Sequence, residues 1–154
     1  MNKGFTLLEF LIVVAIIVIL STFAIPAWDR FIEINKYHND IMAVEHTINR
    51  AKITAMSKTT NIGVCVDSET NGILINDMGF ERGNNPCSGT LLFAVRLQGI
   101  NTKITSSGSI IFDPRGLNIT VGGHICVYND EFNSYYKIII SRGAQRVEKG
   151  SGSC

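Results

Sequence analysis

The sequence predicts an α+β fold in which one long N-terminal helix packs on a small antiparallel β domain. Three observations support this prediction. Residues 10–27 form an apolar run without a charge, residues 34–55 repeat apolar side chains at helical spacing, and every glycine except Gly4 follows residue 60. Glycine marks turns, so short strands and turns are expected in the C-terminal part. A chain of 154 residues has room for one membrane helix and one modest domain.

The N-terminal segment is long enough to span a membrane. A helix needs about 20 mainly apolar residues to cross the hydrocarbon layer. Residues 5–27 reach this length, and Glu9 is the one ionisable side chain among them. A carboxylate in the membrane costs roughly 2.5–3.5 kcal/mol on insertion scales, so we expect Glu9 to have a function. Lys3 precedes the segment, and positive charge favours the cytoplasmic side, so the C-terminal domain is expected outside the cytoplasmic membrane.

Pro26 interrupts the helical pattern near the end of this segment. Proline has no amide hydrogen to donate toward Thr22, and its ring crowds the preceding turn. We therefore expect a kink at Pro26, with the hydroxyl groups of Ser21 and Thr22 helping to satisfy the freed carbonyls. Trp28 follows at the position of an interfacial aromatic residue.

Residues 28–57 are predicted to continue the helix as an amphipathic segment. Its apolar stripe has a/d spacing and consists of Ile34, Tyr37, Ile41, Val44, Ile48, Ala51 and Ala55. The opposite face carries Lys36, Asn39, Asp40, Glu45, Asn49, Arg50 and Lys52. Such a stripe either seeds a coiled coil or packs on the chain's own sheet. We expect the second arrangement, because a β-rich segment follows and needs a cover.

Residues 58–154 are predicted to form the β-rich domain. The expected strands span residues 61–67, 72–76, 90–97, 102–105, 109–112, 117–121, 124–128 and 135–141. Clustered turn formers predict a loop over residues 78–89. The spacing suits a small antiparallel sheet or a sandwich, and the glycines after residue 142 are interpreted as terminal flexibility.

Four cysteines are consistent with an oxidising compartment. None belongs to a Cys-x-x-Cys motif, so zinc and redox motifs lack support, and four cysteines allow three pairings. We favour Cys65–Cys87, which would close a loop rich in Gly, Asn and Asp. We also favour Cys126–Cys154, which would join the last residue to a strand.

Residues 3–9, Lys-Gly-Phe-Thr-Leu-Leu-Glu, resemble the class III signal of type IV pilins and secretion pseudopilins. The resemblance implies that a prepilin peptidase removes residues 1–4 by cutting between Gly4 and Phe5, and then methylates Phe5. Glu9 of a neighbouring subunit would neutralise the new amine in a medium where unpaired charges are costly. An ordinary secretory signal would instead show a small-residue cleavage site after the apolar run. The alternative is an uncleaved single-pass anchor.

Three segments of the β region resemble the H-type pseudopilin and minor-pilin group. They are residues 110–116, with a Phe-x-x-x-Gly turn, residues 125–127 and residues 138–141. The resemblance implies a non-enzymatic structural subunit of a type II secretion pseudopilus or a type IV pilus. Its partners would be other pilin or pseudopilin subunits, the prepilin peptidase and the bacterial inner membrane, with the β domain in the periplasm.

One branch of that group binds DNA during natural transformation through a C-terminal Gly-Arg-x-Arg segment. Here residues 141–146 read Ser-Arg-Gly-Ala-Gln-Arg, so alanine follows the glycine. Arg142, Arg146 and Lys149 still provide positive charge for phosphate contacts. Base stacking would depend on Tyr135 and Tyr136 alone. We therefore expect a solvated basic tail and keep a pilus-associated DNA-uptake receptor as the alternative.

No catalytic, metal or cofactor motif is predicted. His38 and His46 are eight residues apart, which is not the i, i+4 spacing of a metal pair. The carboxylates Asp67, Glu69 and Asp77 lie in a polar region and are expected to be solvated. The net charge of +1 supports no argument from whole-chain charge.

Overall fold

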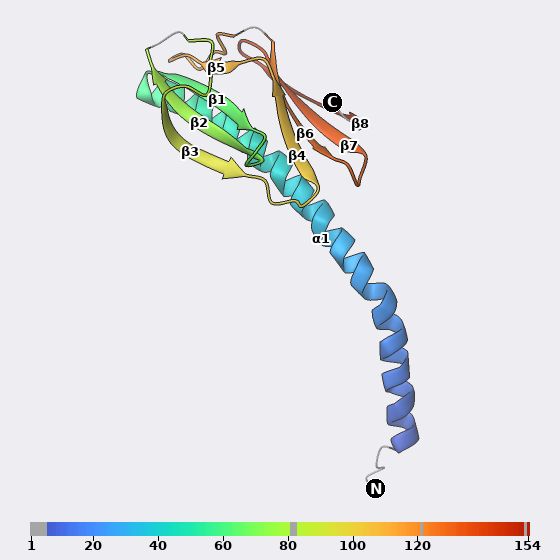
Figure 1. Ribbon diagram of the computed structural model, residues 1–154. Helices are drawn as coiled ribbons and strands as arrows, with labels where there is room; N and C mark the ends of the chain where they lie inside the picture. Colours follow the sequence, from blue (N-terminus) through green and yellow to red (C-terminus); the bar gives the residue numbers. More distant parts are fainter. Residues whose placement is uncertain (1–5, 81–82, 121, 153) are drawn as a thin grey trace. The chain divides into compact units, whose positions relative to one another are not determined.

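The expected α+β fold is present in the computed structural model of the chain, which describes residues 6–80, 83–120, 122–152 and 154 (Figure 1). Among these residues, the helix α1 (Leu7–Lys58) is followed by eight strands. The strands are β1 (Asn61–Asp67), β2 (Gly72–Gly79), β3 (Thr90–Arg96), β4 (Thr102–Ser107), β5 (Ile110–Phe112), β6 (Gly123–Asn129), β7 (Ser134–Ile140) and β8 (Gln145–Ser151).

The chain divides into two compact units, Met1–Asn35 and Lys36–Cys154. The first unit contains the N-terminal part of α1. The second contains the rest of α1 and all the described strands, so it holds the whole β domain.

The described strands form two four-stranded antiparallel sheets. Sheet A has the order β3-β2-β1-β5, and sheet B has the order β4-β6-β7-β8. In sheet A, Val64 pairs with Ile75 on one side and with Ile110 on the other. The sequence left open a single sheet or a sandwich, and the structure has two sheets that share one core.

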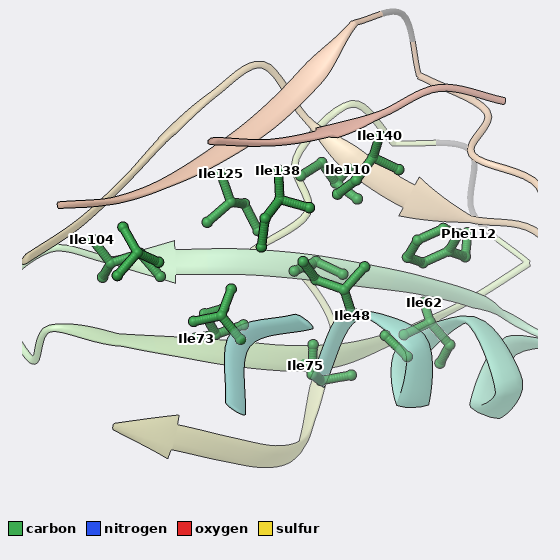
Figure 2. Close-up of a cluster of buried hydrophobic side chains, with 14 of the residues drawn as sticks. Ile48, Ile62, Ile73, Ile75, Ile104, Ile110, Phe112, Ile125, Ile138 and Ile140 are labelled. Carbon is green, nitrogen blue, oxygen red and sulfur yellow. The ribbon is translucent and has the colours of Figure 1, made fainter. Parts of the chain in front are cut away.

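The C-terminal part of α1 supplies one side of that core. The predicted stripe is buried from Tyr37 to Ala55, and it belongs to one cluster with side chains from both sheets (Figure 2). The strand residues of the cluster are Ile62, Val64, Ile73, Ile75, Ile104, Ile110, Phe112, Ile125, Val127, Ile138 and Ile140. Burying one such side chain contributes roughly 1.5–3 kcal/mol relative to leaving it exposed. The stripe therefore packs on the chain's own sheets, as expected.

Asp40 was expected on the polar face of the helix, and this expectation is wrong. The residue is 2% exposed. Its two carboxylate oxygens accept hydrogen bonds from the backbone amides of Gln98 and Gly99, each at 2.8 Å. The charge is buried because it satisfies two amides of the β3–β4 connection, and it thereby joins α1 to that loop.

The strand expected over residues 117–121 is also not observed; residue 121 lies outside the described residues. Phe112 and Asn118 form only an isolated bridge. The Asn118 amide oxygen accepts from the backbone amide of Ile111 at 3.2 Å, and its nitrogen donates to the carbonyl of Ile140 at 3.1 Å. The backbone amides of Asn118 and Ile119 bond the carbonyls of Arg142 and Ile111, which lie in separate segments. The side-chain bonds of Asn118 take further backbone groups, which is the usual competition of Asn and Asp with regular structure.

Strand β8 was missed, because its residues were interpreted as a flexible tail. It pairs with β7 along its whole length, from Ile140 opposite Gln145 to Ser134 opposite Ser151. Gly150 is required for space, since a Cβ atom there would lie 2.7 Å from the ring of Tyr135. The strand lies at the edge of sheet B, and charged residues are common on edge strands because they prevent pairing with other chains.

Both favoured disulfides are confirmed. Cys65 in β1 bonds Cys87, with a Cα–Cα distance of 4.9 Å. Cys126 in β6 bonds Cys154, with a Cα–Cα distance of 6.3 Å. The second bridge ties the segment after β8 back to β6, across the intervening strand β7.

Candidate functional site

The first turn of α1 contains the candidate assembly residue. Thr6 precedes the helix, and its hydroxyl accepts a hydrogen bond from the backbone amide of Glu9 at 3.3 Å. The spacing Thr-x-x-Glu is that of a capping box, a signal that the sequence analysis did not use. Glu9 thus occupies the positive end of the helix dipole, where a carboxylate is favoured. The predicted processing residues Gly4 and Phe5 lie outside the described residues.

The side chains that follow Glu9 along the helix are apolar, and no other part of their own unit covers them. Every side chain from Leu7 to Leu20 is exposed, including Phe10 at 64%. By length and composition, α1 includes a stretch able to cross a membrane. A run of this length needs lipid or other apolar helices as its surroundings.

Pro26 lies inside α1, which continues through it to Lys58. The hydroxyl groups of Ser21 and Thr22 donate to the carbonyls of Ile17 and Ile19, both at 2.7 Å. These hydroxyls therefore bond earlier carbonyls, and not the carbonyl of Thr22 that proline leaves without its usual donor. The expected compensation at Thr22 is wrong, and the kink at Pro26 stays a prediction.

The basic residues proposed for DNA contact lie on an ordered strand and its preceding turn. Arg142 is exposed in the turn between β7 and β8, while Arg146 and Lys149 belong to β8. Residues three apart in a strand point to opposite faces. Arg146 also forms an ion pair with Glu148 at 3.2 Å. The structure does not bring the three cations together on one surface.

The Phe-x-x-x-Gly turn fastens β5 to the end of the helix. Asp113 accepts hydrogen bonds from the amides of Arg115 and Leu117, both at 2.9 Å, and pairs with the Arg115 guanidinium at 2.8 Å. Burial raises the pKa of Asp113, but these hydrogen bonds outweigh it and hold the pKa below its usual value. Gly116 has φ +74°, and a Cβ atom there would lie 2.9 Å from the sulfur of Met56.

The remaining acidic groups bond separate partners. Asp67 accepts from the hydroxyl of Thr70 at 2.5 Å, and Asp77 pairs with Lys58 at 3.2 Å. Within the described residues, no three His, Cys, Asp or Glu side chains are arranged to hold a metal ion. Asp67 therefore stabilises a turn, and Asp77 takes part in a surface ion pair.

Two family models match this chain. Residues 1–25 match the prokaryotic N-terminal methylation motif. Residues 40–144, more than half of the chain, match the type II transport protein GspH. The chain belongs to the GspH family. The GspH match runs from the buried part of α1 to the turn before β8, so it contains the Phe-x-x-x-Gly turn but not the basic strand.

Two solved structures are similar to this GspH-family chain. The minor pseudopilin EpsH of the Type 2 Secretion System of Vibrio cholerae is 10% identical, with 71% of this chain and 95% of that chain covered and a TM-score of 0.49. The type IV minor pilin FimU of Pseudomonas aeruginosa is 15% identical, with 77% and 92% covered and a TM-score of 0.57. The likeness to FimU shows the fold. None of the curated proteins compared with the chain is significantly similar to it.

The predicted resemblance to pilins and pseudopilins is thus confirmed. The GspH-family chain is a pilin-like protein of the kind found in type II secretion systems or type IV pili. Pilins and pseudopilins are structural subunits that assemble with other pilin subunits, and they are not enzymes. An N-terminal apolar helix followed by this fold fits a membrane-anchored, filament-forming protein.

Proposed function

We propose that the chain is a minor subunit of a type II secretion pseudopilus or a type IV pilus. A prepilin peptidase cuts between Gly4 and Phe5 and methylates the amine of Phe5. The observation that carries the proposal is the match to the methylation motif over residues 1–25, a stretch that includes the start of the apolar helix and the carboxylate in its first turn.

Before assembly, residues 5–27 anchor the subunit in the inner membrane. Lys3 stays on the cytoplasmic side and residues 58–154 lie in the periplasm. The two disulfides support this orientation, because such bonds form and persist in oxidising compartments.

During assembly, the same apolar helix leaves the lipid and packs against the helices of other subunits. Lipid tails and apolar side chains are similar environments, so this transfer has little hydrophobic driving force per residue. A charged pair therefore has a large influence on register. The amine of Phe5 in one subunit and Glu9 of its neighbour form that pair, since either charge alone is costly in an apolar medium.

The proposal is tested by intact mass and N-terminal sequence of the protein purified from its native membrane. We expect a chain that starts at N-methylated Phe5. The matched control is the protein from cells that lack the prepilin peptidase, which should start at Met1. A start at Met1 in peptidase-competent cells would contradict the proposal and favour an uncleaved anchor.

The alternative, a DNA-uptake receptor, makes a different prediction. It requires salt-sensitive DNA binding that is lost when Arg142, Arg146 and Lys149 are neutralised. The pairing of Arg146 with Glu148 and the opposite orientation of Lys149 give this alternative less support than the structural role.

A further inference from the structure

A small cavity lies between α1 and the turn that joins β7 to β8. Its volume is about 40 Å³. Apolar side chains from three elements line one part of it, namely Ile48 of α1, Phe112 of β5 and Ile140 of β7. Figure 2 shows these three side chains in the hydrophobic core. Lys52, Arg142 and Gln145 also line it. The cavity therefore combines apolar walls with two cations and two amide side chains, those of Asn49 and Gln145.

The amide of Gln145 is unsatisfied. Its nitrogen is buried and has no hydrogen-bond partner within the described part of the chain. A buried donor without an acceptor loses its interaction with water and gains nothing in return, so such groups are rare in folded proteins. An acceptor that enters the cavity would remove this cost.

The two cations at the cavity also lack partners. Of the described acidic side chains, none forms an ion pair with Lys52 or Arg142. Arg115, by contrast, lies in the neighbouring turn and is already paired with Asp113. Water solvates the two cations, since Arg142 is exposed and Lys52 is half-buried. A carboxylate is a single acceptor that suits both charges and the amide at once.

Size and shape restrict the class of anion. The volume of about 40 Å³ exceeds the roughly 10–15 Å³ that a cavity measured in the same way needs to hold one water molecule. The space therefore suits a small anion, such as the carboxylate group of an acidic side chain. The arginine fork also matches a carboxylate with two parallel hydrogen bonds.

We infer that this cavity is a binding site for a carboxylate, held by Lys52, Arg142 and the amide of Gln145. The carboxylate is either an acidic side chain of a neighbouring subunit or a small free anion. The first source rests on the proposed function, because it requires a filament neighbour. The binding site itself does not depend on filament assembly.

The test uses the full-length, ¹⁵N-labelled protein in detergent micelles. Sodium acetate is titrated against sodium chloride at equal ionic strength, and the side-chain amide resonance of Gln145 is followed. We expect a saturable shift with acetate and none with chloride. Gln145→Glu places a carboxylate in the cavity and should weaken acetate binding by about tenfold or more, which corresponds to about 1.4 kcal/mol per factor of ten.

The control variant Lys137→Met removes a cation from the outer side of sheet B and should leave acetate binding unchanged. The site is overturned if acetate gives no saturable shift, if Gln145→Glu binds acetate like the parent, or if inorganic phosphate binds more tightly than acetate. If water alone occupies the cavity beside Gln145, acetate will give no saturable shift, and the proposal is overturned.

A cellular arm distinguishes the two sources of the carboxylate. Reduced filament incorporation of Gln145→Glu, with normal processing at Phe5, would assign the carboxylate to a neighbouring subunit. Normal incorporation together with acetate binding in vitro would assign the site to a free carboxylate. A chain that is not processed at all would refute the proposed function and leave the acetate result intact.

Discussion

Glu9 is the residue whose chemistry departs most from its surroundings. It lies among exposed apolar side chains, and Thr6 caps its turn. We predict that Glu9→Leu is inserted into the membrane and processed normally, because leucine suits lipid better than a carboxylate does. Incorporation into filaments should fall by about tenfold or more, since the amine of the neighbouring Phe5 then lacks its counter-charge. The measurement is the amount of variant in sheared or cross-linked filaments.

Ser21→Leu is the matched control for this prediction. It also replaces a polar side chain by leucine within the same segment, but it removes only a hydroxyl that bonds the carbonyl of Ile17. Its incorporation should match that of the parent. Equal incorporation of Glu9→Leu and Ser21→Leu would show that Glu9 has no role in assembly.

Asp113 links the stability of the β domain to pH. Its folded-state pKa is lowered, so the charged form stabilises the fold at pH values above its unfolded pKa of about 3.9. That contribution is lost as the pH falls below this value through the folded pKa. Asp113→Asn should lower the free energy of unfolding by roughly 1–3 kcal/mol at pH 7, and its stability should depend less on pH below about 4. Chemical denaturation followed by circular dichroism at pH 7 and pH 3 measures both effects.

The comparison variant for Asp113 is Asp130→Asn. Asp130 forms an exposed ion pair with Lys103 at 2.6 Å, and pairs of this kind contribute little because solvent screens them. Stability at pH 7 should hardly change. If both variants unfold alike at both pH values, the hydrogen bonds of Asp113 are not a source of pH dependence.

At the scale of single residues, the sequence predicts the chemical role of a side chain better than it predicts whether that side chain is buried. The cysteine pairs were predicted because Cys65–Cys87 closes a polar loop and Cys126–Cys154 joins the last residue to a strand. Asp40 was assigned to the polar face because it falls outside the a/d positions of the apolar stripe. Its partners are the backbone amides of Gln98 and Gly99. Hydrogen bonds to backbone amides cannot be predicted from a pattern of side chains. The buried amide of Gln145 also escaped prediction.

Among the elements, β8 depends most on a covalent bond. It is an edge strand, and the bridge from Cys154 to Cys126 holds the chain that follows it against sheet B. We predict that Cys126→Ala combined with Cys154→Ser reduces hydrogen-exchange protection in β8 more than in β1 or β2. The free energy of unfolding should fall by roughly 2–4 kcal/mol.

The other bridge supplies the comparison for β8. Cys65→Ala combined with Cys87→Ser should loosen the segment around Cys87 and leave the protection of β8 as in the parent. Equal loss of protection in β8 for both double variants would contradict a local role of the Cys126–Cys154 bridge.

The elements also differ in how well sequence periodicity predicts them. The apolar stripe of α1 and strands such as β1 were predictable because burial on one face imposes a period. Strand β8 has no such period, since its Gln, Arg, Glu and Lys residues are half-exposed or exposed at an edge. Residues 117–120 look like a strand in sequence, yet the side chains of Asp113 and Asn118 take part of the hydrogen bonding that a partner strand would provide. The backbone amides of Asn118 and Ile119 bond two separate segments, at Arg142 and Ile111, so no ladder forms.

At the scale of the whole molecule, the two units differ in the surroundings that their apolar side chains need. Most apolar side chains of the first unit are exposed and need lipid or neighbouring helices, whereas the core side chains of the second unit bury one another. Every residue of the core cluster lies between Tyr37 and Ile140. The sequence predicted the contrast between an uninterrupted apolar run and a periodic stripe, which differ in the solvent they need. It placed the segment boundaries after residues 27 and 57, whereas the two units divide after Asn35.

This division predicts that residues 36–154 fold without the membrane segment. The fragment keeps the core and both disulfides, so it should be soluble and should unfold cooperatively near the melting temperature of the full chain in detergent. Near-UV circular dichroism and thermal unfolding are the measurements. The control fragment, residues 59–154, lacks Tyr37, Ile41, Val44, Ile48, Ala51 and Ala55 of the core and should aggregate, because the sheets then expose the apolar surface that α1 covers. Aggregation of the longer fragment as well would mean that the first unit supplies part of the fold's stability, and that the chain is one thermodynamic unit instead of two.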